Sequence, residues 1–161
     1  LPAMLGRAQE IYEQSGPHGL MTQLMMSFGK MRYREAEPLI RKYLPRNFDL
    51  GELPRASADW AIGFFYDEPP EDLVSLLTGR LDDIRSAPPE YEDVRTMSAL
   101  TLGRIGAKMA VPDLQRYADD RGGFTAQACH WSIEQLTGTP APDPLPAFPV
   151  DFEDWFLRPM K

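Results

Sequence analysis

The chain has 161 residues, a formal net charge of −7 and 43% hydrophobic residues. This length and composition are typical of one compact globular domain that can bury a core. The acidic balance argues against nucleic acid or an anionic membrane surface as a partner, because both attract basic surfaces. No apolar run approaches the roughly 20 residues that span a bilayer.

The single cysteine, Cys129, excludes an internal disulfide and favours a reducing compartment, which we expect to be the cytoplasm. The chain begins with Leu1 and not with Met. A preceding signal peptide or a further domain of a larger chain therefore stays open.

The apolar residues recur at intervals of three and four, and almost none alternate with a period of two. This spacing is typical of amphipathic helices and recurs along most of the chain, at Leu20, Leu24, Phe28; Leu73, Leu76, Leu77, Leu81; and Met97, Leu100, Thr101, Ile105. We therefore predict an all-α protein. Its first helix covers residues 1–14, ends at Ser15–Gly16–Pro17 and caps the N-terminal end of the fold.

A repeat underlies the helices after residue 20. Residues 29–40 match residues 103–114 without a gap, and this alignment pairs Gly29 with Gly103 and Pro38 with Pro112. A middle copy holds Gly63 and Pro70, with a turn that is two residues shorter. A partial fourth copy covers residues 127–138 and ends in Gly138.

Each repeat suggests a pair of helices. We expect the first helix to end at its glycines, where Gly103 with Gly106 supplies a left-handed cap. Proline then opens the second helix, because its missing N–H costs nothing there. Asp93 is the predicted N-cap of the first helix in the third copy. Because one pair cannot bury its apolar face alone, about four pairs are predicted to stack.

Residues 93–120 resemble a bacterial HEAT repeat of the type found in phycobilisome lyase subunits. The resemblance is carried by five features: Asp93–Val94–Arg95, the small Ala99, "LGRIG", "AVPDL" and Asp119–Asp120. Residues 29–44 and 55–81 match more loosely, and the second copy has Tyr66 where the pattern has a second glycine. The resemblance covers roughly residues 20–138. It implies that residues 1–138 form an α-solenoid, in which Arg95 ties adjacent repeats by hydrogen bonds.

Residues 139–161 differ from the repeats, because five prolines favour an extended polyproline II path. Asp151 is placed to cap one short turn that carries Phe152, Trp155, Phe156 and Leu157. We expect this turn to pack on the last helix pair and cover its apolar edge. The alternative is that it docks into another molecule.

The sequence contains few residues that could form a catalytic or metal site. With His18, His130 and one cysteine, the usual zinc clusters of Cys and His cannot form. Cys129 and His130 point about 100° apart on a helix, so a buried structural thiol is favoured over a nucleophile. Acidic residues gather in predicted turns without the alternating oxygen ligands of a calcium loop. We therefore predict no catalytic residue, no cofactor and no metal.

Two candidate binding surfaces remain. One is the methionine group Met21, Met25, Met26 and Met31, for which core filling is favoured over an adaptable partner surface. The other follows from the resemblance, since second helices usually line the concave face of such solenoids. Its polar positions are Arg41, Lys42, Thr78, Arg80, Gln115 and Arg116. The three arginines suggest a basic stripe for an acidic protein segment, against ordinary surface charge as the alternative.

The function that we predict is a non-enzymatic scaffold that binds another protein through its concave face. The alternative is a phycobilin lyase-like or lyase-accessory subunit that binds a bilin, and it depends on the resemblance alone. A DNA-repair solenoid of the alkyl-purine glycosylase kind would need a basic groove, which the acidic balance disfavours.

Overall fold

The computed structural model describes residues 1–16, 18–119 and 123–140. Within these ranges the chain forms eight α-helices, three short 3-10 helices and no strand, which confirms the all-α prediction. The α-helices are α1 (Pro2–Glu13), α2 (His18–Lys30), α3 (Glu37–Ile40), α4 (Glu52–Ile62), α5 (Glu71–Leu81), α6 (Glu92–Arg104), α7 (Val111–Ala118) and α8 (Phe124–Thr137). The 3-10 helices are Arg34–Ala36, Phe48–Leu50 and Lys108–Ala110.

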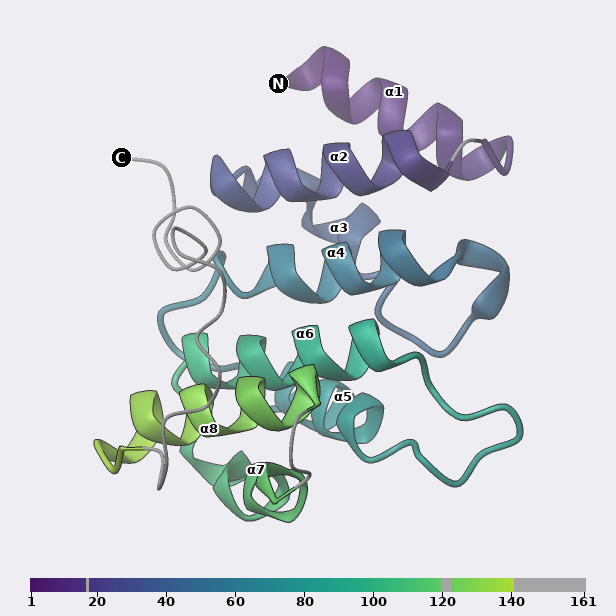
Figure 1. Cartoon of the computed structure of the whole chain (residues 1–161). Helices are drawn as coiled ribbons and strands as arrows, with labels where there is room; N and C mark the ends of the chain where they lie inside the picture. Colours follow the sequence, from purple (N-terminus) through teal and green to yellow (C-terminus); the bar gives the residue numbers. More distant parts are fainter. Residues whose placement is uncertain (17, 120–122, 141–161) are drawn as a thin grey trace.

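The first helices of the repeated units lie side by side. Figure 1 shows α2, α4, α6 and α8 stacked in chain order and running in the same direction, each packed against the next, with α1 against α2. The second helices lie on another side of this layer, where α3 contacts α4, α5 contacts α6 and α7 contacts α8. The C-terminal ends of the four first helices therefore gather at one side of the molecule.

Three glycines allow these helices to approach closely. A Cβ added to Gly29 would lie 2.7 Å from the Cα of Ala61, and one on Gly103 would lie 2.7 Å from the Cα of Ser132. A Cβ on Gly63 would lie 2.9 Å from Nη1 of Arg104. The first helices end at or next to these glycines, as predicted, since Gly29 and Gly103 are the penultimate residues of α2 and α6 and Gly63 is the C-cap of α4. None of the three supplies the predicted left-handed backbone. Their function is contact between consecutive first helices.

Left-handed backbone occurs slightly later in the chain. Gly106 and Gly138 both have φ 74°, which confirms the predicted caps at these positions. In the first unit, Arg32 aligns with Gly106 and adopts φ 49° despite its side chain. The reversal of the chain at this point is thus common to both units, although only one of them uses glycine.

The helix starts follow the prolines. Pro38 and Pro112 lie in the first turn of α3 and α7, as predicted, whereas Pro70 is the N-cap residue just before α5. The predicted Asp93 cap is wrong, because Tyr91 holds the N-cap position of α6 and no side chain caps it. Asp93 lies in the first turn instead, where a negative charge favours the helix dipole.

The core lies between the two helix layers. Met21 and Met25 are fully buried in it, which confirms their predicted role as core fillers, whereas Met26 and Met31 are half-buried. Other large buried side chains come from several helices and turns, among them Phe28, Ile40, Leu44, Trp60, Leu73, Leu77, Leu81 and Leu102. The predicted aromatic turn at residues 152–158 lies outside the described residues. No helix in the described part is long and apolar enough to cross a bilayer.

Candidate functional site

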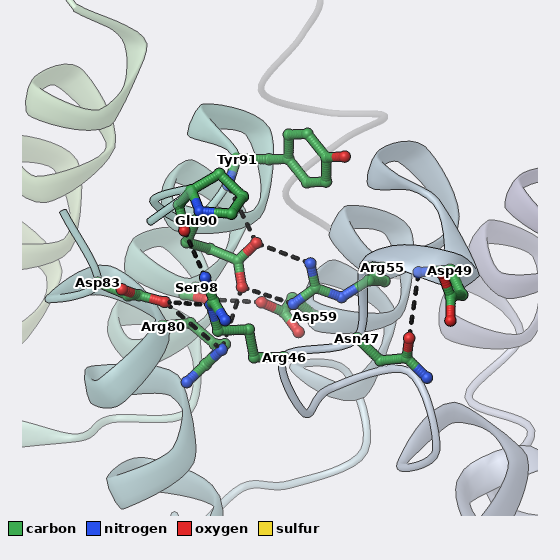
Figure 2. Close-up of polar contacts among 11 residues, drawn as sticks. Arg46, Asn47, Asp49, Arg55, Asp59, Arg80, Asp83, Glu90, Tyr91 and Ser98 are labelled. Carbon is green, nitrogen blue, oxygen red and sulfur yellow. Dashed lines mark hydrogen bonds and ion pairs between the residues drawn. The ribbon is translucent and has the colours of Figure 1, made fainter. Parts of the chain in front are cut away.

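A buried ion pair joins α4 to the start of α6 (Figure 2). Arg55 donates from Nη1 to Oε1 of Glu90 at 2.7 Å and from Nη2 to Oε2 at 2.5 Å. Both side chains are completely shielded from solvent. This bidentate geometry is the strong form of an arginine–carboxylate contact, and it fixes the loop before α6 against α4.

Further groups complete the bonds of Glu90. Its carboxylate accepts from the backbone N–H of Tyr91 at 3.0 Å and from Nη1 of Arg80 at 3.2 Å. Burial alone would raise the pKa of Glu90, but these bonds and the nearby guanidinium groups hold it below the usual value. The ionised carboxylate of Glu90 therefore links α4, α5 and the start of α6 through these bonds.

Arg46 extends the network to the loop before α4. Its Nε lies 2.9 Å from Oδ2 of Asp83, and its Nη2 donates to the carbonyl of Pro88. Burial would raise the pKa of Asp83, but Ser86, Arg46 and Arg80 together hold it below the usual value. The long connection between α5 and α6 is thus tied down by charges from other elements.

Asp59 is the unusual member of this cluster. It lies one turn after Arg55 on α4 and is fully buried. Ser98 of α6 donates to its Oδ2 at 2.5 Å, while its Oδ1 has no hydrogen-bond partner among the described residues. Burial raises the pKa of Asp59 to about 8. Perturbed carboxyls are typical of catalytic sites, but Asp59 does not line the groove described next.

The groove lies across three first helices, and we call it the first-helix groove. It has a volume of about 220 Å³ and is lined by Thr22, Met26, Leu53, Ala56, Ser57, Trp60, Asp93 and Met97. Trp60 is buried, whereas Leu53 is 56% exposed. One member, Asp93, is charged. A concave, mostly apolar opening with few polar groups is the usual form of a binding site.

Two cations lie beside Trp60, at the C-terminal ends of α2 and α6. Nζ of Lys30 is 5.7 Å from the ring centroid of Trp60, and the guanidinium of Arg104 is 5.6 Å from it. Nη1 of Arg104 also donates to the Trp60 carbonyl at 2.9 Å. Burial lowers the pKa of Arg104 to about 9, and burial followed by the charge of Arg104 lowers the pKa of Lys30. The two positive charges are therefore close enough to repel.

The three arginines predicted to form a basic stripe are each paired with carboxylates. Arg41 contacts Glu37 at 2.8 Å and Asp72 at 2.9 Å. Arg80 contacts Glu90 at 3.2 Å. Arg116 contacts Asp82 and Asp113, each at 3.0 Å. These contacts reduce the positive charge that an acidic partner would meet on the second helices.

The other predicted surface residues are separate from one another. Nζ of Lys42 lies 4.5 Å from the ring centroid of Tyr12, so this residue contacts α1. Thr78 is half-buried on α5, and Gln115 is exposed on α7. None of these three lines the first-helix groove.

Two structural predictions agree with the observed contacts. Nε of Arg95 donates to the carbonyl of Leu81 at 3.0 Å, which ties α6 to the end of α5 in the preceding unit. Cys129 is completely buried, and burial raises the pKa of its thiol to about 12. Because the thiolate is the nucleophile, this environment is that of a structural cysteine.

Sequence reasoning missed both the groove and the Arg55–Glu90 pair. Arg55 and Asp59 are four residues apart and lie among the apolar residues of α4, which is a weak signal for buried charge, but this spacing does not point to Glu90. The groove has no such signal, because its lining comes from three helices. No group of three or more His, Cys, Asp or Glu side chains within the described ranges is arranged to hold a metal ion.

Comparison with known proteins does not place the chain in a family. No protein-family model matches the sequence, and no curated protein matches it at a significant level. The resemblance of residues 93–120 to a HEAT repeat therefore stays a prediction.

Proposed function

We propose that this chain is a HEAT-like α-solenoid that acts as a non-enzymatic scaffold in the cytoplasm and binds another protein. The observation that carries this proposal is the first-helix groove, to which α2, α4 and α6 each contribute apolar side chains. The stacked first helices and their glycine contacts support the solenoid part of the proposal.

The groove suggests the chemistry of its partner. Its volume of about 220 Å³ exceeds the ~150 Å³ of a cavity that holds benzene, so a bulky apolar or aromatic side chain fits. A peptide segment with an aromatic or bulky aliphatic anchor therefore complements the groove.

The proposed binding surface is the first-helix groove and not the predicted concave face of the second helices. Arg41, Arg80 and Arg116 already bind carboxylates of the same chain. A partner that used them would have to displace these contacts. None of these three arginines lines the first-helix groove, so a partner that binds there leaves their ion pairs intact, and we place the surface there.

The proposal is tested by capturing partners from a host lysate with matched variants. Leu53→Glu puts a charge into the groove, whereas Met109→Glu changes a side chain that is 66% exposed outside it. We expect a captured protein to be lost with Leu53→Glu and kept with Met109→Glu. Its binding segment, made as a peptide, should then bind the wild type at least tenfold more tightly than Leu53→Glu in calorimetry.

Two other results would contradict this assignment. Capture that survives Leu53→Glu but is lost with the double variant Arg41→Glu, Arg116→Glu would place the surface on the second helices. Visible absorbance that stays with the protein after incubation with a bilin and gel filtration would favour the lyase-like alternative instead.

A further inference from the structure

We propose that the first-helix groove selects a partner segment that combines an aromatic or large aliphatic side chain with a lysine or arginine about 6 Å away. The apolar side chain binds beside Trp60 and Met97, and the cation binds the carboxylate of Asp93. This inference rests on the proposed function, because it names the chemistry of the partner that the groove binds. Asp93 is the residue that determines specificity.

The charge that borders the groove is negative. Asp93 is the one charged side chain among the described residues that line it. Lys30 and Arg104 lie beside Trp60, but they do not line the groove. The net charge of −7 also attracts a basic segment at longer range and repels an acidic one.

The carboxylate of Asp93 has a second negative charge beside it. Burial raises the pKa of Glu52, at the start of α4, and the charges of Asp93 and Glu90 raise it further. Within the described residues, no ion pair or side-chain hydrogen bond involves the carboxylate of Asp93 or of Glu52. A cation bound at Asp93 therefore relieves a repulsion that the protein does not neutralise by itself.

Two arginines of α4 and α6 bind other groups. The guanidinium of Arg55 is fully buried against Glu90. Arg95 lies two residues after Asp93, about 200° further around α6. Its Nε donates to the carbonyl of Leu81, so its charge faces the second helices. Neither arginine pairs with Asp93 in the groove.

The register of α4 and α6 places the charge at one end of the groove. The two helices run in the same direction, and the bond from Ser98 to Asp59 sets these residues level with each other (Figure 2). Trp60 follows Asp59 directly, so it lies at this level in the apolar part of the groove. Leu53 and Asp93 lie six and five residues before the bonded pair and border the N-terminal end.

The partner requires the same spacing. Met97 lies four residues after Asp93, which is about 6 Å along α6. Two side chains of a partner are separated by a similar distance when they lie one turn apart on a helix or two residues apart on an extended strand. An anchor beside Met97 and a cation at Asp93 thus fit on one short segment.

The first experiment selects ligands without a known partner. Short random peptides displayed on phage are panned against the full chain, and those that also bind Leu53→Glu are removed. The remaining peptides depend on the groove, because Leu53 lines it. We expect them to be enriched in lysine or arginine next to an aromatic or large aliphatic residue and depleted of acidic residues.

Matched variants then test Asp93 with one enriched peptide in calorimetry. Asp93→Asn should weaken binding about threefold at low salt, as the loss of one exposed ion pair does, and less at high salt. Glu92→Gln is the control, because Glu92 is exposed in the same first turn of α6 but does not line the groove. It should leave the affinity unchanged.

An exchange of charges separates recognition from helix stability, since Asp93 also lies in the first turn of α6. Asp93→Lys should weaken the basic peptide by roughly tenfold. The same variant should bind more tightly than the wild type to a peptide whose cation is replaced by glutamate. A circular dichroism spectrum confirms that each variant is folded.

The outcomes distinguish this inference from the proposed function. Groove-dependent peptides without a basic residue, or equal affinities of the wild type and Asp93→Asn for a basic peptide, would overturn this inference and leave the scaffold proposal standing. If no peptide is lost with Leu53→Glu, the groove is not a binding surface, and both proposals are rejected.

Discussion

Asp59 is held in the neutral form by its surroundings. It is buried between α4 and α6, accepts a bond from Ser98 at 2.5 Å, and Thr101 donates to its backbone carbonyl at 2.6 Å. Burial raises its pKa to about 8 even though Arg55 is near. The folded protein therefore binds a proton here that the unfolded chain releases near pH 4.

This shift predicts a pH dependence of stability. From about pH 4 to pH 8 the folded state holds one more proton than the unfolded state, so the free energy of unfolding falls as the pH rises. Asp59→Asn removes this contribution. Chemical denaturation at several pH values should show that the advantage of the wild type over Asp59→Asn shrinks between pH 5 and pH 8.

Asp67→Asn is the control for this measurement, because the Asp67 side chain is 91% exposed. Its difference from the wild type should stay constant over the same range. A constant difference for Asp59→Asn would mean that the pKa of Asp59 is not raised.

The burial of the Arg55–Glu90 pair predicts a large loss of stability when one partner is replaced. Glu90→Gln leaves the fully buried guanidinium of Arg55 without its counter-charge, which should cost about 3–5 kcal/mol of unfolding free energy. Glu10→Gln removes one partner of the exposed Arg7–Glu10 pair and should cost less than about 1 kcal/mol. Urea denaturation measures both, and equal losses would argue against a structural role for the buried pair.

Helix contacts are decided by single glycines. Gly103 lies inside α6, where a Cβ would meet Oγ of Ser132 at 2.4 Å and its Cα at 2.7 Å. The second of these atoms belongs to the backbone, so α8 would have to move away. The side chain of Ser132 would also lose its bond to the carbonyl of Ala99, which is 2.7 Å long.

Gly103→Ala should therefore destabilise the protein by about 1–3 kcal/mol, as overpacking does. Gly79 offers a matched control, because it lies inside α5 and nothing is within 4 Å of an added Cβ. Gly79→Ala should stabilise by up to about 1 kcal/mol through helix propensity. Thermal denaturation of both variants checks the signs, and a stabilising Gly103→Ala would show that the two helices are not in close contact.

The whole molecule is a stack with unequal ends. α4 and α6 are covered on both sides by other first helices, whereas α1 contacts α2 and buries only Ala8 and Ile11 completely. Helices with few buried contacts open most easily. The N-terminal end should accordingly be less stable than the centre.

Hydrogen–deuterium exchange tests this gradient. Amides of α1 should exchange first, and those of α4 and α6 should be the most protected. The comparison is made on one sample under native conditions, so no variant is required. Equal protection of α1 and α4 would contradict the gradient and would indicate a single cooperative unit.

Much of the architecture was determined by the sequence alone. The three-to-four spacing of Leu73, Leu77 and Leu81 specifies helices, since only one face of each can be buried. Pro38 and Pro112 mark helix starts because proline lacks the N–H that an interior position needs. Gly106 marks a chain reversal because it tolerates a positive φ. These are local constraints, which are readable within a few residues.

Only the tertiary structure decided which residues meet. Gly29 and Gly103 looked like caps, but their function depends on Ala61 and Ser132, which belong to neighbouring helices. The arginines of the expected basic stripe form ion pairs with carboxylates on adjacent elements. Glu90 pairs with Arg55, which is 35 residues away in the sequence. The first-helix groove likewise exists only where three helices lie side by side. Such contacts depend on how helices pack, and packing is not encoded in the spacing of residues along any one helix.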